Sequence, residues 1–273
     1  MPTAAMVARV VGEEEQLVAS AIDPVCEMEV DEATAAATSV YQGRTYYFCA
    51  PGCKVAFDGD PQRYLQKATG GEVVEAPETA SGAPITMPVD VAIKSRRSVT
   101  RMKPDSVPLK AIERMLDAAV WAPNHHLTQP WEFVVLVGDA RRRLAEVRRE
   151  FRRTLFKDPD APEVQPALKK VYNDTLATPA IIAVTTSAPG DADLRDDDYG
   201  ATMCAIQNMM LVATGLGLGT YLRTGGFIHF PPLREFLAVP EGRRVVGIVY
   251  VGYADHIPER RRRPFSEKTR WLD

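Results

Sequence analysis

The stretch Trp121–Val135, WAPNHHLTQPWEFVV, joins the two patterns that decide the fold of the larger part of this chain. Before it, Val107–Trp121 repeats apolar residues with a helical period, and Pro108 is well placed to open that helix. After it, Glu132–Val137 is a compact apolar run of the kind that forms a buried strand. The stretch therefore predicts a helix followed directly by a strand of a buried sheet.

Further apolar segments extend this pattern. Ala180–Thr185 and Val245–Val251 predict two more buried strands. Between them, Tyr199–Gly215 is apolar around nearly all its circumference, which is typical of a helix at the centre of a domain or against a partner subunit. Cys204 lies in this helix and is expected to serve packing only. The predicted fold class is α+β, with helices around one sheet.

The composition is that of a soluble globular protein. The chain has 273 residues, of which 45% are hydrophobic and 25% charged, enough for one large domain and one small domain. The net charge of −3 predicts no attraction to nucleic acid or to an anionic membrane. No segment approaches the roughly 20 apolar residues of a membrane span, and the first residues do not resemble a secretory signal. We expect a cytoplasmic protein with neither nucleic acid nor membrane as partner.

A change of composition divides the chain. Lys67–Pro88 is rich in Gly, Ala, Pro, Thr and Glu and lacks an apolar period, which predicts a linker. The expected organisation is an N-terminal extension over residues 1–21, a small domain over residues 22–66, the linker over residues 67–88 and a large domain over residues 89–273. No internal repeat relates the two domains.

The small domain has a simple predicted architecture. Ser39–Phe48 reads as two short strands around a Gln42-Gly43 turn, and Cys53–Leu65 reads as a single helix. A core of about 45 residues is marginal without a disulfide or a metal to stabilise it. A bound metal would therefore have a structural role here.

Three of the four cysteines fall in this small domain. Cys49 and Cys53 are separated by three residues, whereas a redox dithiol more usually has two, and a hairpin could bring Cys26 back to the pair. Three thiolates suit zinc, copper(I) or another thiophilic ion. The alternative is three inert thiols that pack as small hydrophobic side chains. The spacing alone leaves both interpretations open.

Three blocks occur here in order: DPVCEMEV (Asp23–Val30), YQGRTYYFCAPGC (Tyr41–Cys53) and FDGDPQRYL (Phe57–Leu65). Together they resemble a YHS domain, a small treble-clef-like family. The resemblance leaves the metal open between zinc, copper and iron. It implies three metal ligands: Cys26, Cys49 and Cys53.

The large domain concentrates arginines and glycines in three segments. Lys94–Asp105, KSRRSVTRMKPD, places arginine forks beside a serine, which suits a phosphate dianion, although such a segment can also be a solvated loop. Gly217–Phe227, GLGTYLRTGGF, has glycines that let backbone amides approach a ligand. Glu259–Pro264, ERRRRP, follows the last strand and is strongly basic.

With Ala122–Trp131, these segments resemble the nitroreductase family of flavin enzymes over essentially all of residues 89–273. The resemblance implies a nitroreductase-like FMN-binding α+β sandwich that forms an intertwined homodimer, with FMN at the interface. It also implies ping-pong electron transfer from NAD(P)H through FMN to a small acceptor: a nitroaromatic, a quinone, an enone or, in this fusion, a metal ion. Flavin N5 carries the chemistry, so no side chain is expected to be catalytic.

The same resemblance assigns the cofactor-binding positions. A backbone amide, that of Gly225, is expected at flavin N5, and Arg223 is expected to stabilise the charge of reduced flavin near N1. Thr100 stands where typical members have the lysine that serves this region. His126 is expected to be a structural or surface side chain. The implied FMN-binding residues are Arg96, Arg97, Ser98, His125, Leu222, Arg223, Thr224, Gly225, Arg262 and, as a second choice for the late arginine, Arg260.

Two other functions remain open at this point. One is a metal sensor or carrier that uses the flavin domain only as a dimerisation scaffold. The other is a side-branch of the flavin family, such as a dehalogenase or a flavin-destroying enzyme. The intact RRS, HLTQPW and LRTGG segments favour the oxidoreductase over the scaffold, because a scaffold needs no flavin-binding residues.

Overall fold

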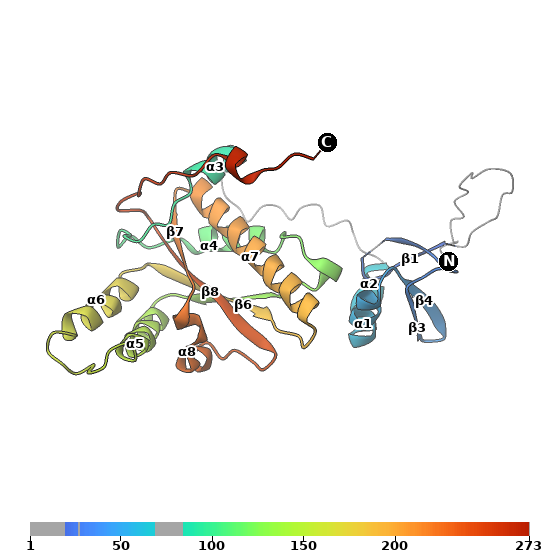
Figure 1. The fold of residues 1–273 in the computed structure, drawn as a ribbon, viewed down its shortest axis with the longest axis horizontal. Coiled ribbons are helices and arrows are strands. Elements are labelled where there is room, and N and C mark those ends of the chain that lie inside the picture. Colours follow the sequence, from blue (N-terminus) through green and yellow to red (C-terminus); the bar gives the residue numbers. More distant parts are fainter. Residues whose placement is uncertain (1–19, 27, 69–83, 273) are drawn as a thin grey trace. The chain divides into compact units, whose positions relative to one another are not determined.

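A computed structural model describes residues 20–26, 28–68 and 84–272 of the chain (Figure 1). These residues form two compact units: a smaller one, residues 20–68 with the segment Asn124–Thr128, and a larger one with the remainder. The predicted N-terminal extension and linker lie mostly outside the described residues, and the predicted domain boundaries stay predictions. None of the described helices is long and apolar enough to cross a membrane.

The smaller unit contains two antiparallel hairpins. Strand β1 (Ser20–Ile22) pairs with β2 (Glu29–Asp31), and β3 (Ala37–Tyr41) pairs with β4 (Arg44–Phe48). The predicted turn lies between β3 and β4, with Gln42 at φ 50° and Gly43 at φ 77°. Two successive positive φ angles match the right-handed twist of the strands, so the predicted hairpin is confirmed.

The single helix expected over Cys53–Leu65 was wrong. The structure has two helices, α1 (Pro51–Gly59) and α2 (Pro61–Ala68), separated by Asp60 at φ −154° and ψ 79°. The ring of Pro61 disfavours helical backbone at the residue before it, so α1 ends there. The same proline opens α2, because the first helical position needs no backbone N–H donor.

An aromatic cluster forms the core of the smaller unit. Phe57 of α1 is fully buried, and four aromatic rings from β3, β4 and α2 surround it at centroid distances of 4.9–6.4 Å. Val25 and Cys53 are buried in the same cluster. Cys53 therefore lies at the edge of the core, where its sulfur is held in one place.

The larger unit is built on a four-stranded antiparallel sheet. Its strands are β5 (Trp131–Leu136), β6 (Ala180–Ser187), β8 (Arg243–Gly252) and β7 (Gly219–Arg223), in the spatial order β5-β6-β8-β7. The three strands predicted from apolar runs are confirmed. Strand β7 was not predicted, because its sequence reads as a glycine-rich loop.

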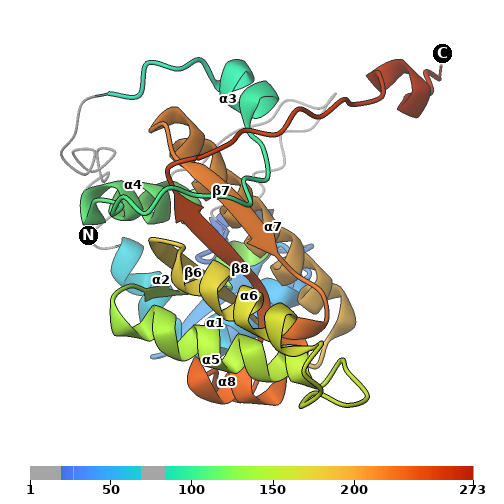
Figure 2. The same cartoon turned by 90° about the vertical axis from the view of Figure 1, so that its left-hand side faces the viewer.

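Helices cover both faces of this sheet (Figure 2). On one face, α4 (Leu109–Ala119) and α7 (Ala192–Gly215) bury their apolar residues, and on the other α5 (Asp139–Arg153) and α8 (Pro231–Phe236) do so, with α6 (Gln165–Leu176) beside α5. Neighbouring strand residues alternate between the two cores: Ile182 faces the first and Ile181 the second. Short helices α3 (Val89–Ser95), η1 (His125–Leu127), η2 (Gly226–His229) and η3 (Phe265–Lys268) complete the described elements.

Helix α7 is buried on only one side. Ala205 and Met209 are fully buried against the sheet, whereas Cys204 is exposed and Tyr199 is 38% exposed. Within this chain the helix is therefore not buried all round, and the packing of Cys204 against a partner subunit stays a prediction. Periodicity does not mark the exposed side, because that side of the helix also carries apolar residues.

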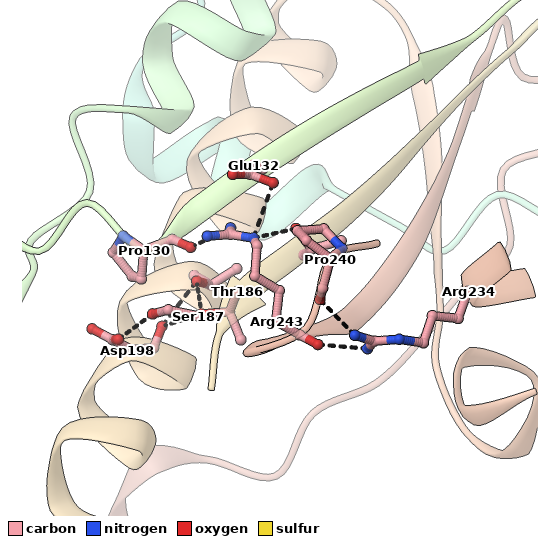
Figure 3. Close-up of polar contacts among 10 residues, drawn as sticks. Pro130, Glu132, Thr186, Ser187, Asp198, Arg234, Pro240 and Arg243 are labelled. Atoms are coloured by element: carbon pink, nitrogen blue, oxygen red, sulfur yellow. Dashed lines mark hydrogen bonds and ion pairs between the residues drawn. The ribbon is translucent and has the colours of Figure 1, made fainter. Parts of the chain in front are cut away.

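An arginine joins the start of β8 to the start of β5 (Figure 3). The Arg243 guanidinium donates to the carbonyl of Pro130 at 2.7 Å and pairs with the Glu132 carboxylate at 2.9 Å. From α8, Arg234 donates to the carbonyl of Arg243 at 2.6 Å. These contacts fix the point where the chain enters β5.

Candidate functional site

The three thiols of the smaller unit meet at one point. Cys26 follows the first strand, Cys49 follows β4, and Cys53 lies in the first turn of α1. The Sγ atoms of Cys26 and Cys49 are 3.4 Å apart, and those of Cys49 and Cys53 are 3.7 Å apart. A disulfide needs about 2.05 Å, whereas two thiolates on a tetrahedral zinc at about 2.3 Å each would lie about 3.8 Å apart. The spacing fits thiols around a metal.

A buried carboxylate shapes this cluster. Asp23 is fully buried, and one of its carboxylate oxygens and the three sulfurs lie within 4.8 Å of one another. One oxygen accepts the Val25 N–H at 2.8 Å and the other accepts the Cys49 N–H at 2.9 Å. Burial alone would raise the pKa of Asp23, but these hydrogen bonds outweigh burial and hold the pKa below its usual value. Asp23 thus remains an anion that fixes the backbone of both cysteine-bearing turns.

Two of the thiols, Cys49 and Cys53, are protonated at neutral pH in the absence of a cation. Burial, reinforced by hydrogen bonds to Cys26 and Asp23, raises the pKa of Cys49 to about 11. Burial and the neighbouring Asp23 carboxylate also raise the pKa of Cys53. Protonated thiols are poor nucleophiles, which argues against the redox dithiol. A thiophilic cation would instead displace these protons and bind the thiolates.

Sequence reasoning missed two residues of this cluster. Asp23 precedes a proline and accepts a hydrogen bond from the residue two positions on, a turn pattern that could have marked it as structural. His126 lies in the segment grouped with the smaller unit, and its Nδ1 is 2.9 Å from Cys53 Sγ. The two residues are 73 positions apart, so nothing in the local sequence relates them.

The larger unit brings three arginines together. Arg96 and Arg97 directly follow α3, and Arg262 comes from the C-terminal segment. Burial first, and then the positive charges of Arg262 and Arg97, lower the pKa of Arg96. Within the described residues, no carboxylate forms an ion pair with any of the three. Three guanidinium groups without a counter-charge suit an anion that accepts several hydrogen bonds.

The segment after these arginines lies along β7. Ser98 pairs with Thr220 in a parallel bridge, and the Val99 N–H donates to the Thr220 carbonyl at 2.9 Å. Farther on, Met102 pairs with Ala254. The strand that Ser98 contacts, β7, thus also carries the predicted residues Leu222 and Arg223.

The residues around the end of β7 differ in what their side chains do. Leu222 packs against Gly247 in the core, so its backbone is the part left for a ligand. The Arg223 guanidinium lies over the rings of Tyr221 and Tyr250 at 5.0 and 5.5 Å. Thr224 and Gly225 line a cavity of about 370 Å³. Gly225 has φ 85° and ψ −160°, a conformation that is essentially restricted to glycine.

The two remaining predicted positions, Arg260 and His125, make other contacts. Arg260 is exposed, donates to the carbonyl of Glu259 and is not among the charges that act on Arg96. His125 belongs to the segment grouped with the smaller unit, where its ring stacks on His126 at 3.7 Å. The structure therefore brings together Arg96, Arg97 and Arg262, and places Ser98 beside β7.

Comparison with known proteins gives a consistent result for both units. A model of the nitroreductase family matches residues 93–253, and a model of the YHS domain matches residues 21–68. The Bacillus subtilis protein YfhC, provisionally named an NAD(P)H nitroreductase, is 29% identical over 178 residues, covering 64% of this chain and 90% of YfhC.

Solved structures share the fold of the larger unit. A nitroreductase-like family protein from Bacillus cereus superposes with a TM-score of 0.62 and 31% identity, covering 68% of this chain and 97% of that chain. The FMN-dependent nitroreductase NfnB from Mycobacterium smegmatis, solved in complex with NADPH, gives a TM-score of 0.54 and 24% identity, covering 67% and 97%. The second likeness concerns the fold alone. The predicted nitroreductase-like α+β fold is confirmed.

Proposed function

The chain belongs to the nitroreductase family and carries an N-terminal YHS domain, and on this premise we propose that it is an FMN-dependent NAD(P)H oxidoreductase. The observation that carries the proposal is the cluster of Arg96, Arg97 and Arg262 without a carboxylate partner among the described residues. A phosphate monoester supplies the dianion that such a cluster lacks. The relative YfhC, provisionally named an NAD(P)H nitroreductase, supports the same assignment.

Each predicted residue has a role in this proposal. Arg96 and Arg262 bind the FMN phosphate, and Arg97 adds charge while donating to the carbonyls of Lys94 and Arg96. Ser98 donates its hydroxyl to the phosphate or the ribityl chain. The remaining assignments are the backbone of Leu222, Thr224 and Gly225 along the flavin ring, and a ring contact from His125.

The bound FMN would take a hydride from NAD(P)H and pass its electrons to a small acceptor, such as a nitroaromatic or a quinone, in ping-pong order. The protein orients donor and acceptor in turn and excludes water from the site. Arg223 contributes a cation whose Nε is buried without a partner among the described residues. A cation in that environment stabilises negative charge more strongly than one in water.

Exposed apolar side chains support a homodimer with a wrapping C-terminal segment. Val89 of α3 is 68% exposed, and near the C-terminus Phe265 and Trp271 are 74% and 80% exposed. The apolar outer side of α7 adds to this surface. Extended apolar surface of this kind is typical of an interface between subunits.

The smaller unit contributes a thiolate metal site in this proposal. Cys26, Cys49 and Cys53 are the ligands, and zinc, copper or iron is the candidate ion. Two hairpins followed by a helix that carries a ligand support the treble-clef-like expectation. The metal stabilises a small aromatic core.

Anaerobic mixing of the purified holoprotein with NADH or NADPH tests the enzymatic assignment. We expect the bound flavin to bleach with at least one donor, and to regain its colour when a nitroaromatic or a quinone is added. A protein that carries metal but retains no FMN would instead favour the carrier or sensor. Equilibrium sedimentation of the same sample tests the dimer.

A further inference from the structure

We propose that His126 is the fourth ligand of the thiolate site, which makes it a closed, tetrahedral Cys3His zinc site. The inference rests on the proposed metal site of the smaller unit and adds its fourth donor. That donor comes from Asn124–Thr128, the segment that groups with residues 20–68. Its sequence neighbour His125 is a predicted flavin contact, so zinc binding at His126 would also fix the backbone next to that residue.

The contact distance carries the proposal. His126 Nδ1 lies 2.9 Å from Cys53 Sγ, and Cys53 Sγ lies 3.7 Å from Cys49 Sγ. An imidazole nitrogen and a thiolate on one tetrahedral zinc would lie about 3.6 Å apart, from bond lengths of about 2.1 and 2.3 Å. The imidazole would therefore move away from Cys53 Sγ by about 0.7 Å to admit the ion. Coordination through Nδ1 requires the neutral tautomer with its proton on Nε2.

The sequence between Cys49 and Cys53 makes room for this imidazole. Gly52 lies between Cys49 and Cys53, in the first turn of α1. A Cβ atom at Gly52 would meet His126 Nε2 at 2.7 Å, a separation too short for a real contact. The absence of a side chain at Gly52 thus lets the ring lie over the turn that carries Cys53.

Asp23 is the competing fourth donor, and its hydrogen bonds argue against it. Both of its oxygens already accept backbone N–H groups, from Val25 and Cys49. Coordination by Asp23 would weaken the bonds that hold the turns of Cys26 and Cys49. We therefore assign Asp23 as a positioning residue and His126 as the ligand.

The donor set selects the ion and its role. Three thiolates and one neutral imidazole in a tetrahedron are a common structural set for zinc. Four protein ligands leave no open coordination position for a substrate. The metal therefore stabilises the smaller unit, and the electron acceptor is not a metal ion bound at this site.

X-ray absorption spectroscopy of the zinc-loaded full-length protein tests the assignment. We expect three sulfur ligands and the outer-shell scattering of one imidazole in the wild type. His126→Ala should lose the imidazole signal and weaken zinc affinity more than the roughly 10- to 100-fold typical of changes to residues that only hydrogen-bond a metal ligand. His256→Ala, at an exposed position, is the matched control and should keep both.

Two further variants keep the test independent of folding defects. His126→Cys should restore tight zinc binding with four sulfurs, and Gly52→Ala should weaken binding although every ligand is retained. An unchanged imidazole signal in His126→Ala overturns the inference, as does loss of an oxygen ligand in Asp23→Asn. A wild-type protein that binds no zinc at all would refute the proposed thiolate site itself, a result distinct from the loss of the fourth donor.

Discussion

The thiol cluster of the smaller unit and the arginine cluster of the larger unit are assembled in opposite ways. Cys53 is buried and Cys26 and Cys49 are half-buried; Cys49 and Cys53 are uncharged at neutral pH in the absence of a cation, and a carboxylate that binds the backbone holds the cluster. The arginines bring positive charge; Arg96 and Arg97 are half-buried and Arg262 is exposed, and all three lack carboxylate partners among the described residues. The first cluster must lose protons to bind a cation, whereas the second already holds the charge that an anion needs.

Because of this difference, metal binding should stabilise the folded state of the smaller unit, whereas phosphate binding should act on a larger unit that is already folded. Metal binding to the thiols would be linked to the stability of the smaller unit, because the same residues form its core. Phosphate binding to the arginines would relieve repulsion between like charges that the folded larger unit already contains. Substitutions in the two clusters should therefore differ in whether they change folding or only ligand affinity.

The largest effect is expected from Cys53→Ser. Zinc sites contribute about 10–16 kcal/mol at neutral pH, so one of four ligands accounts for about 3 kcal/mol, more than a hundred-fold in affinity. Competition with a chromophoric chelator measures this loss, and the smaller unit should also unfold more readily. Cys204→Ser, at the exposed cysteine of α7, is the control. Equal zinc affinity in both variants would show that Cys53 is not a ligand.

Arg96→Ala should weaken FMN binding by about 10- to 100-fold, because a hydrogen bond to a charged group contributes about 1.5–3 kcal/mol. Riboflavin lacks the phosphate, so its affinity should stay the same. Fluorescence titration of the flavin-free protein measures both. Arg101→Ala, whose guanidinium pairs with Asp255, is the matched control. An equal loss of riboflavin affinity would mean that Arg96 acts elsewhere than at the phosphate.

Gly225→Ala should cost about 1–3 kcal/mol in the free energy of unfolding, because alanine is strained at φ 85° and ψ −160°. Chemical denaturation of the flavin-free protein measures the change. Gly200→Ala in α7, where a Cβ meets no atom, should instead be neutral or stabilising. A neutral Gly225→Ala would argue that this segment relaxes without cost and is not a rigid part of the flavin site.

The smallest expected effect on FMN affinity distinguishes Arg260 from Arg262, the two candidate phosphate-binding arginines of the basic segment near the C-terminus. Arg262→Ala should weaken FMN binding by about ten-fold, since the charge of Arg262 acts on Arg96. Arg260→Ala should stay within about two-fold, in the range of an exposed charge. The same fluorescence titration compares them. A larger loss of FMN affinity in Arg260→Ala than in Arg262→Ala would show that Arg260 is the residue that binds the phosphate.

Much of the fold was predictable from local patterns. The strands β5, β6 and β8 are apolar runs, and the Gln42-Gly43 hairpin follows from turn chemistry. The break at Asp60 was missed because the effect of Pro61 on its neighbour was not weighed against helical periodicity. The sequence did not show that Cys204 is exposed within this chain, because an apolar surface and an apolar core look alike in sequence.

The sequence by itself determined the chemical character of both sites: soft sulfur donors in one, and arginines with glycines in the other. Only the tertiary structure placed Arg262 beside Arg96 and His126 beside Cys53. Periodicity and turn residues act over a few positions, so they are encoded locally. Contacts between distant residues form only when packing of the whole unit offsets the entropy of closing the intervening chain.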